Sequence, residues 1–418
     1  MKKASLRPIL IFLCFSLLAV LSVFTSSCAS ADGKMVTELY VYNWGEYISD
    51  GSEDSLDSNE AFEEWYYETY GERVKVTYST FSSNEDMYAK LSAGAVNYDV
   101  IVPSDYMIER LIEEKMLAPL DYANIPNIVN IVPEFYGENA EFDYYDEGNV
   151  YSVPYFYGMI GIIYNTEMVD PEDESLGSWA LMWDPDYTGN ILQFNNSRDA
   201  FGTAQYYLGL DVNSENEDEW RLALDKLREQ KDIAQGYVMD EIFNKMQGGS
   251  AAISAYYAGD FLTMYEENDA LEFYYPKEGT NLYVDAMCIP KTSQNKLVAE
   301  RYINFMLMEE PAIANAEYTY YASPNRLVRE NEEYIEYMNS IKDDAYEKMY
   351  GTENVRTQAY ANLSGEHLAM INELWEELKS DIKVSPTIYV ICSLIVIALI
   401  AFTTFHLIRK RVRSSYYD

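Results

Sequence analysis

The sequence contains little cysteine. Four cysteines occur among 418 residues, and two of them, Cys14 and Cys392, lie in apolar runs near the ends of the chain. The central part therefore retains only Cys28 and Cys288. If Cys28 is modified, no internal disulfide can form. The central part must then be stabilised by its apolar core, which a pair of domains of this size can supply.

Histidine is scarcer still. The two histidines are His367, in an expected helix, and His406, in the C-terminal apolar run. A Ser-His or Cys-His catalytic pair therefore cannot be assembled in the central part. The stretch Gly248-Gly249-Ser250 also lacks the lysine of a phosphate-binding loop. These absences predict a binding protein that is not an enzyme, with no cofactor and no metal centre.

Basic residues are too few to balance the acidic ones. Lys and Arg number 30 against 69 Asp and Glu, which gives a formal net charge of −39. A field of this sign repels nucleic acid and attracts cations, although acidity that only maintains solubility is the alternative. Apolar residues, by contrast, make up 48% of the chain, so it can form two globular lobes and is not disordered.

The two ends of the chain resemble export and anchoring segments. Residues 1–27 place basic residues before an apolar run, as in a secretory signal peptide, and lipidation at Cys28 is favoured over ordinary cleavage after Ala31. Residues 386–408 form an apolar run long enough to cross a bilayer, and the basic tail at 409–418 is expected in the cytoplasm. A buried helix is the alternative for residues 386–408. The acidic body is therefore expected on the extracellular face of the cell membrane.

Strand and helix patterns alternate along the chain, which is typical of an α/β fold. The expected strands span residues 39–42, 74–78, 98–104, 155–164 and 191–194, and the expected helices span residues 61–70, 85–91, 108–115 and 219–230.

Aromatic and polar residues follow two of these strands. Trp44 and Tyr47 come after the first, and Ser104 and Tyr106 come after the third. Open α/β sheets bind their ligands at the carboxyl ends of their strands. These residues are therefore candidates for a binding site, and core packing of the aromatic rings is the alternative.

Motifs along the chain resemble those of one family. They are Tyr42-Asn43-Trp44 with Glu46-Tyr47, Tyr78-Ser79-Thr80 with Ser83-Asn84-Glu85, Val102-Pro103-Ser104 with Tyr106, Tyr151-Ser152-Val153-Pro154-Tyr155, Trp179 to Trp183, Pro276-Lys277-Glu278-Gly279, Asp285 with Ile289-Pro290, and Tyr321 with Pro324-Asn325. In these motifs the sequence resembles the spermidine/putrescine-binding proteins of bacterial polyamine ABC importers, over about residues 37–380.

The resemblance implies a type II periplasmic-binding-protein fold, with two α/β lobes, hinge crossings and a ligand cleft between the lobes. The first lobe would comprise residues 37–153 with 284–320, and the second residues 154–283 with 321–380. It also implies a polyamine ligand, and an ABC permease and an ATPase as partners.

A polyamine needs carboxylates for its ammonium groups and aromatic faces for its methylenes. The family's ligand positions, carried over one at a time, are Trp44, Tyr47, Ser104, Tyr106, Asn196, Asp199, Tyr256, Tyr283, Asp285 and Tyr321. Asp285 is the strongest candidate for the salt bridge to an ammonium group, and an Asp that caps a turn is the alternative.

Four positions depart from the family pattern. Gly45 replaces a hydroxyl residue, Asn196 replaces an Asp, and Tyr replaces Trp at Tyr256 and Tyr283. A carboxylate is lost at Asn196, and Asp105 is a candidate to replace it. The choice between putrescine and spermidine therefore stays open.

Ferric iron is the alternative ligand. The chain has 40 tyrosines, with adjacent pairs at Tyr256-Tyr257 and Tyr320-Tyr321, and relatives of this fold chelate iron through two tyrosinates. Hard-cation sites also require a histidine or carboxylate nearby, and the aromatic motifs match the polyamine branch instead.

Overall fold

The computed structural model describes residues 36–94, 96–137, 140–351 and 354–380. The chain divides after His367 into two compact units, and the sheet and cavity below belong to the first. One ten-stranded sheet forms its centre, in the order β2-β1-β3-β9-β4-β7-β5-β6, with β10 paired to β9 and β8 paired to β4. The strands are β1 (Val36–Trp44), β2 (Arg73–Phe81), β3 (Val100–Ile101), β4 (Ser152–Asn165), β5 (Ile191–Phe194), β6 (Ala234–Val238), β7 (Ile253–Tyr257), β8 (Leu271–Tyr274), β9 (Thr280–Cys288) and β10 (Thr357–Gln358).

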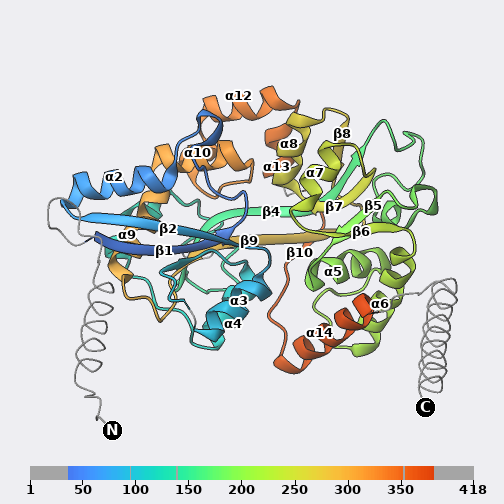
Figure 1. Ribbon diagram of the computed structural model, residues 1–418, viewed down its shortest axis with the longest axis horizontal. Coiled ribbons are helices and arrows are strands. Elements are labelled where there is room, and N and C mark those ends of the chain that lie inside the picture. Colours follow the sequence, from blue (N-terminus) through green and yellow to red (C-terminus); the bar gives the residue numbers. More distant parts are fainter. Residues whose placement is uncertain (1–35, 95, 138–139, 352–353, 381–418) are drawn as a thin grey trace, which may run out of the picture. The chain divides into compact units, whose positions relative to one another are not determined.

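Helices cover both faces of this sheet, with α2 and α10 on one side and α3, α4 and α5 on the other (Figure 1). The helices are α2 (Ser58–Tyr70), α3 (Asn84–Ala93), α4 (Asp105–Glu113), α5 (Ser197–Leu208), α6 (Glu217–Lys231), α7 (Glu241–Gln247), α8 (Ala258–Glu267), α9 (Lys296–Met306), α10 (Glu309–Thr319), α11 (Arg326–Arg329), α12 (Glu332–Ile341), α13 (Ala345–Tyr350) and α14 (Gly365–Ser380).

The parallel strands form two sets. In the first strand set, β1 runs parallel to β2 and β3, and in the second strand set, β5 runs parallel to β6 and β7. The long antiparallel strands β4 and β9 connect the sets, because β9 pairs with β3 and β4 pairs with β7. The fold is therefore an α/β fold in which the chain passes from one strand set to the other through β4 and β9.

Local signals in the sequence define the first helix. Asp57 caps the amino end of α2, its Oδ1 accepting from the backbone N–H groups of Asn59 at 3.0 Å and Glu60 at 2.9 Å. Gly71, at φ 68°, ends the helix in the left-handed conformation that glycine favours. The helix thus begins three residues before the expected start at residue 61, because a capping residue is a stronger start signal than the first apolar residue.

Two strand predictions were wrong in extent. The strand expected over residues 98–104 is a regular strand only at Val100–Ile101, although Tyr98 and Val102 stay buried. Pro103 has no N–H to donate, and the chain turns there into α4. Trp44, expected on a loop, is the last residue of β1.

Among residues 36–94, 96–137, 140–351 and 354–380, no helix is long and apolar enough to cross a membrane. The expected signal segment at 1–27, the lipidation site Cys28, the apolar run at 386–408 and the tail at 409–418 all lie outside the described residues.

Candidate functional site

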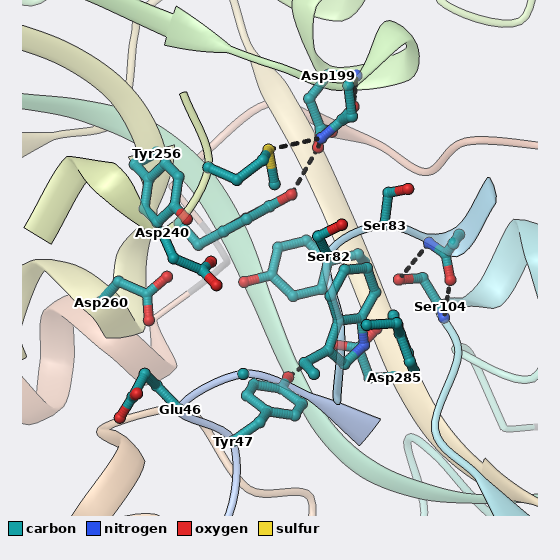
Figure 2. Close-up of a pocket in the computed structure, with 18 of the residues that line it drawn as sticks. Glu46, Tyr47, Ser82, Ser83, Ser104, Asp199, Asp240, Tyr256, Asp260 and Asp285 are labelled. Carbon is teal, nitrogen blue, oxygen red and sulfur yellow. Dashed lines mark hydrogen bonds between the residues drawn. The ribbon is translucent and has the colours of Figure 1, made fainter. Parts of the chain in front are cut away.

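A cavity lies where the carboxyl ends of the two strand sets meet (Figure 2). The volume of the cavity is about 70 Å³. All ten residues predicted from the sequence line it: Trp44, Tyr47, Ser104, Tyr106, Asn196, Asp199, Tyr256, Tyr283, Asp285 and Tyr321. The structure thus brings together residues that lie up to 277 positions apart, Tyr321 minus Trp44.

The cavity is lined by an excess of carboxylates. They number seven, namely Glu46, Glu85, Asp105, Asp199, Asp240, Asp260 and Asp285, and no lysine or arginine is among the described lining residues. Four of the seven, Glu85, Asp105, Asp199 and Asp260, lie in the first turn of a helix. The helix dipole stabilises a negative charge at that position, which helps the fold to hold these four acids close together.

Asp285 projects into the cavity from β9 and is only 4% exposed. Its Oδ2 accepts a hydrogen bond of 2.6 Å from the Tyr47 hydroxyl, whereas its Oδ1 accepts none from the described residues. Burial raises the pKa of Asp285 to about 6. Hydrogen bonds from the hydroxyls of Ser104 and Tyr47 oppose this shift. One oxygen of this carboxyl is thus free for a ligand donor.

Asp105 is held by the protein itself. Its Oδ1 accepts from the backbone N–H of Tyr106 at 2.7 Å, and its Oδ2 accepts a short hydrogen bond from the Tyr144 hydroxyl. Burial raises the pKa of Asp105 to about 7, and repulsion from Asp285 adds to the shift. Asp105 therefore lines the cavity, as expected if it replaces the carboxylate lost at Asn196. Both of its oxygens, however, already accept hydrogen bonds from the protein.

Asn196 acts on its neighbour Asp199. The Asn196 Oδ1 accepts from the Asp199 backbone N–H at 2.9 Å, and the Asn196 Nδ2 donates to Asp199 Oδ2 at 2.7 Å. The Tyr257 hydroxyl donates to the same Oδ2 at 2.6 Å. Burial raises the pKa of Asp199, and these hydrogen bonds and the charge of Arg198 oppose the shift. Asn196, where the family has an Asp, thus carries no charge and instead orients the Asp199 carboxylate.

Glu46, Asp240 and Asp260 lie close enough to repel one another. The Tyr321 hydroxyl donates to Asp260 Oδ2 at 2.9 Å. Burial raises the pKa of Asp260 to about 8, and repulsion from Asp240 and Glu46 adds to the shift. In Figure 2 these three carboxylates lie on one side of the cavity, and Ser104 and Asp285 lie on the other.

Aromatic rings form the walls between the acids. The Trp44 ring packs on Phe81 with centroids 4.5 Å apart, and the Tyr47 ring meets Tyr321 edge-on at 4.7 Å. The Tyr283 hydroxyl, on a side chain only 6% exposed, has no partner among the described residues. Flat apolar faces and unpaired hydroxyls thus accompany the carboxylates, an arrangement suited to a cation with apolar segments.

Several residues that line the cavity were not predicted from the sequence. They are Glu46, Asn84, Glu85, Asp240, Tyr257, Asp260 and Tyr360. Glu85 and Asp260 carry a signal that could have identified them, because each is an acid in the first turn of a helix that follows a strand. Tyr360 carries no such signal, because it lies outside the regular elements, 72 residues after the end of β9.

The ferric-iron alternative is not supported. The Tyr320 hydroxyl donates to Glu266 at 2.7 Å and does not line the cavity, whereas the Tyr321 hydroxyl donates to Asp260. Burial holds the pKa values of Tyr256 and Tyr257 well above their usual range, which favours the phenol over the tyrosinate. Within the described ranges no group of three or more His, Cys, Asp or Glu residues is arranged to hold a metal ion.

Comparison with known proteins gives consistent results. A spermidine/putrescine-binding periplasmic protein of Salmonella typhimurium is 32% identical over 294 residues, covering 70% of this chain and 78% of the relative. Its counterpart in Escherichia coli is 32% identical over 306 residues, covering 72% of this chain and 81% of the relative.

Solved structures agree with the curated relatives. A spermidine/putrescine ABC transporter substrate-binding protein of Streptococcus pneumoniae, crystallised with calcium and HEPES, superposes with a TM-score of 0.63 at 33% identity, covering 82% of this chain and 98% of that one. A lipoprotein of Treponema pallidum gives a TM-score of 0.66 at 25% identity, covering 82% and 99%. The fold is thus the α/β periplasmic-binding-protein fold. The model of bacterial extracellular solute-binding proteins matches residues 60–361, and the chain belongs to that family.

Proposed function

We propose that the cavity binds a linear polyamine and that the chain is the extracellular binding component of a polyamine ABC importer. One observation carries the proposal: seven carboxylates and several aromatic faces line a cavity whose described lining contains no lysine or arginine. Four of these acids, Asp105, Asp199, Asp260 and Asp285, are buried. Burial of a carboxylate is costly, and a ligand with two or more ammonium groups would compensate that cost. The relatives named for binding spermidine and putrescine support the same ligand class.

Each part of such a ligand has a matching group in the cavity. The free Oδ1 of Asp285 would accept from an ammonium group, and Asp199, oriented by Asn196 and Tyr257, would accept from another. The rings of Trp44 and Tyr283 would cover the methylenes between them. The predicted ligand contacts are therefore retained, and Glu46, Glu85, Asp240, Tyr257, Asp260 and Tyr360 are added as further contacts.

The two strand sets would act as lobes that close on the ligand and then present it to a membrane permease driven by an ATPase. Support comes from the two long strands, β4 and β9, which connect the sets and could serve as the hinge. Export and anchoring rest on the sequence alone: the signal-like residues 1–27, Cys28 and the apolar run at 386–408. The polyamine would then be captured at the outer face of the cell membrane.

Calorimetric titration tests this function. The purified full-length chain in detergent would be titrated with spermidine, putrescine, ferric citrate and a neutral sugar. Saturable binding of at least one polyamine, with none of the sugar or iron, is expected. If neither polyamine binds, the proposed function is wrong.

A protease experiment tests the topology. Protease added to intact cells or protoplasts should remove the body and leave a short C-terminal fragment protected. Digestion of an epitope placed after Asp418 from outside would show that the anchor is wrongly assigned.

A further inference from the structure

Arg198 is a buried cation that lies next to the acidic cavity. It is on α5, is only 4% exposed and is not among the residues that line the cavity. Its Nη2 donates to Asn213 Oδ1 at 3.1 Å and to the Ala361 carbonyl at 3.4 Å. Its Nε and Nη1 have no partner among the described residues. Burial of a guanidinium with unpaired donors is costly, so the presence of Arg198 at this place calls for a reason.

Aromatic rings surround this guanidinium. Its Cζ lies 4.5 Å from the centroid of the Tyr360 ring and 5.7 Å from the centroids of Tyr106 and Trp220. The face of a ring attracts a cation but does not neutralise its charge. Tyr106 and Tyr360 line the cavity, so the positive charge of Arg198 lies directly behind its wall.

The helix α5 holds Arg198 against Tyr360. Arg198 and Gly202 are four residues apart and therefore lie on the same face of the helix. A Cβ at Gly202 would overlap the Tyr360 hydroxyl, so the close approach of that ring requires glycine. Asn213 Oδ1, which accepts from Arg198, also accepts from the Ala361 N–H at 2.8 Å. The guanidinium is thus fixed between α5 and the segment that carries Tyr360.

Two acids of the cavity interact with this charge. Asp199 is the neighbour of Arg198 on α5, which follows β5 of the second strand set, and Glu85 is on α3, which follows β2 of the first set. Burial raises the pKa of both carboxyls, and the charge of Arg198 opposes the shift in both. Arg198 therefore holds an acid from each strand set closer to its charged form than burial alone would.

The charge of Arg198 has two opposite effects on a cationic ligand. A carboxyl that is already charged accepts an ammonium group without first losing a proton, whereas a protonated carboxyl must lose one, which costs more as the pH decreases. The same arginine also repels the ligand, and this cost does not depend on pH, because a guanidinium is always charged. The two effects can therefore be separated by changing the pH.

We propose that Arg198 is a positioning residue of the cavity, a resident cation fixed between α5 and Tyr360 that keeps Asp199 and Glu85 charged and ready to accept an ammonium group. This inference rests on the proposed function, because it assigns a role within the same cavity.

The other titratable groups that face Asp199 come from several elements. They are the carboxyls of Glu85 and Asp285 and the hydroxyls of six tyrosines, Tyr106, Tyr206, Tyr256, Tyr257, Tyr283 and Tyr360. Burial raises the pKa of all six tyrosines above their usual range. Between about pH 6 and about pH 8.5, therefore, the carboxyls titrate and the phenols do not.

Calorimetric titration of the full-length chain in detergent with spermidine and with putrescine tests this role. Arg198→Met removes the charge and keeps a long side chain. The dissociation constant of either ligand should rise about tenfold at about pH 6 and less than about threefold at about pH 8.5. Ionisation of the ligand affects both proteins alike, so the ratio of the variant's constant to that of the unaltered chain isolates the effect of Arg198.

Two further variants serve as controls. Arg198→Lys retains the charge and should keep this ratio independent of pH, although lysine stacks less well on a ring. Arg301→Met is the matched control, because the Arg301 guanidinium lies 3.6 Å from the centroid of the Tyr70 ring and Arg301 does not line the cavity. Its ratio should also be independent of pH. If the ratio for Arg198→Met does not change with pH, the role of Arg198 is only structural and the inference is wrong.

Proton release gives a second test, in which Arg198 is not altered. Because Asp199 is held in the charged form, Asp199→Asn should weaken binding but should not lower the number of protons released when spermidine binds at about pH 7. Asp269→Asn is the control, because Asp269 is an exposed acid that does not line the cavity.

A fall in the number of protons released by Asp199→Asn would show that Asp199 is protonated in the empty cavity, and would overturn the inference. Either failure differs from failure of the proposed function, in which the unaltered chain binds neither polyamine.

Discussion

At the scale of single residues, the proposed binding would depend on a carboxyl oxygen that the described residues leave unpaired. Asp285 is the clearest case, with one oxygen bound to Tyr47 and the other without a partner among the described residues. Asp285→Asn should weaken polyamine binding by about 1.5 to 3 kcal/mol, the range for a hydrogen bond to a charged group. Calorimetry measures the change, with Asp269→Asn as the control, and an unaltered affinity would remove Asp285 from the binding site.

The same carboxyls should make binding depend on pH. Burial raises the pKa of Asp285 to about 6, of Asp105 to about 7 and of Asp260 to about 8, so each is partly protonated near neutral pH in the empty cavity. The groups facing Asp260 are Tyr321, Asp240 and Glu46, and the acids among them disfavour its ionisation. A bound cation favours the charged form, so binding should release protons and the affinity should rise as the pH increases through these values of about 6 to 8.

Proton release is measured by repeating the titration in buffers of different ionisation enthalpy.

The stability of the empty protein should change with pH in the opposite direction to the affinity. Because these pKa values are raised on folding, their contribution is fully present below about pH 4 and is lost as the pH rises through the folded values of about 6 to 8. Thermal unfolding without ligand checks this. An affinity that falls as the pH rises would contradict the assignment.

At the scale of elements, one segment that contains the short strand β10 connects the two strand sets near the cavity. The segment, residues 356–362, is held on the second-set side, where the Tyr206 hydroxyl of α5 donates to the Gln358 carbonyl at 3.0 Å and Asn213 Nδ2 donates to the Ala359 carbonyl at 2.8 Å. At its end, the Asn362 N–H donates to Glu109 at 2.7 Å and Asn362 Nδ2 to Glu113 at 2.8 Å. Both acids belong to α4, which follows β3 of the first set (Figure 1).

This connection predicts a mutant that affects closure alone. Asn362→Ala removes the hydrogen bond to Glu113, and Asn362 does not line the cavity. The variant should weaken spermidine and putrescine binding by the same factor, about 2- to 10-fold, which corresponds to one hydrogen bond that stabilises the closed form. Asn97→Ala, at an exposed position, is the control. A change in the ratio of the two affinities would show a direct contact instead.

At the scale of the unit that holds the cavity, the carboxylates should favour separation of the strand sets until a cation is bound. Contacts cross the cavity in this structure: the Arg198 guanidinium of α5 lies 5.7 Å from the Tyr106 ring centroid of α4, and Asp240 lies against Gly45. Without a ligand, repulsion among seven acids opposes these contacts. Spin labels on cysteines placed at Asn97 and Asp269, both exposed, should therefore report a shorter distance when spermidine is added. An identical distance with and without polyamine would argue against closure on the ligand.

Much of the fold and of the cavity could be predicted from the sequence. The helices and strands follow from residue spacing and capping, as at Asp57 and Gly71, because these signals act within a few residues of each other. Where the prediction was wrong, tertiary context decided: the strand expected over 98–104 is regular only at Val100–Ile101, and beyond it Ser104 meets Asp285 of β9 in an isolated bridge.

The sequence by itself determined the element types and the ten expected lining residues, since strand ends and family motifs are local patterns. Only the tertiary structure decided that Asn196 orients Asp199, that Tyr360 reaches the cavity, and that the Asp240 carboxylate lies beside Gly45. The last pair lies 195 residues apart in the chain (240 − 45), at the ends of strands in different sets. No periodicity or cap connects such positions, because their contact depends on how the strand sets pack against each other and not on the conformation of either segment.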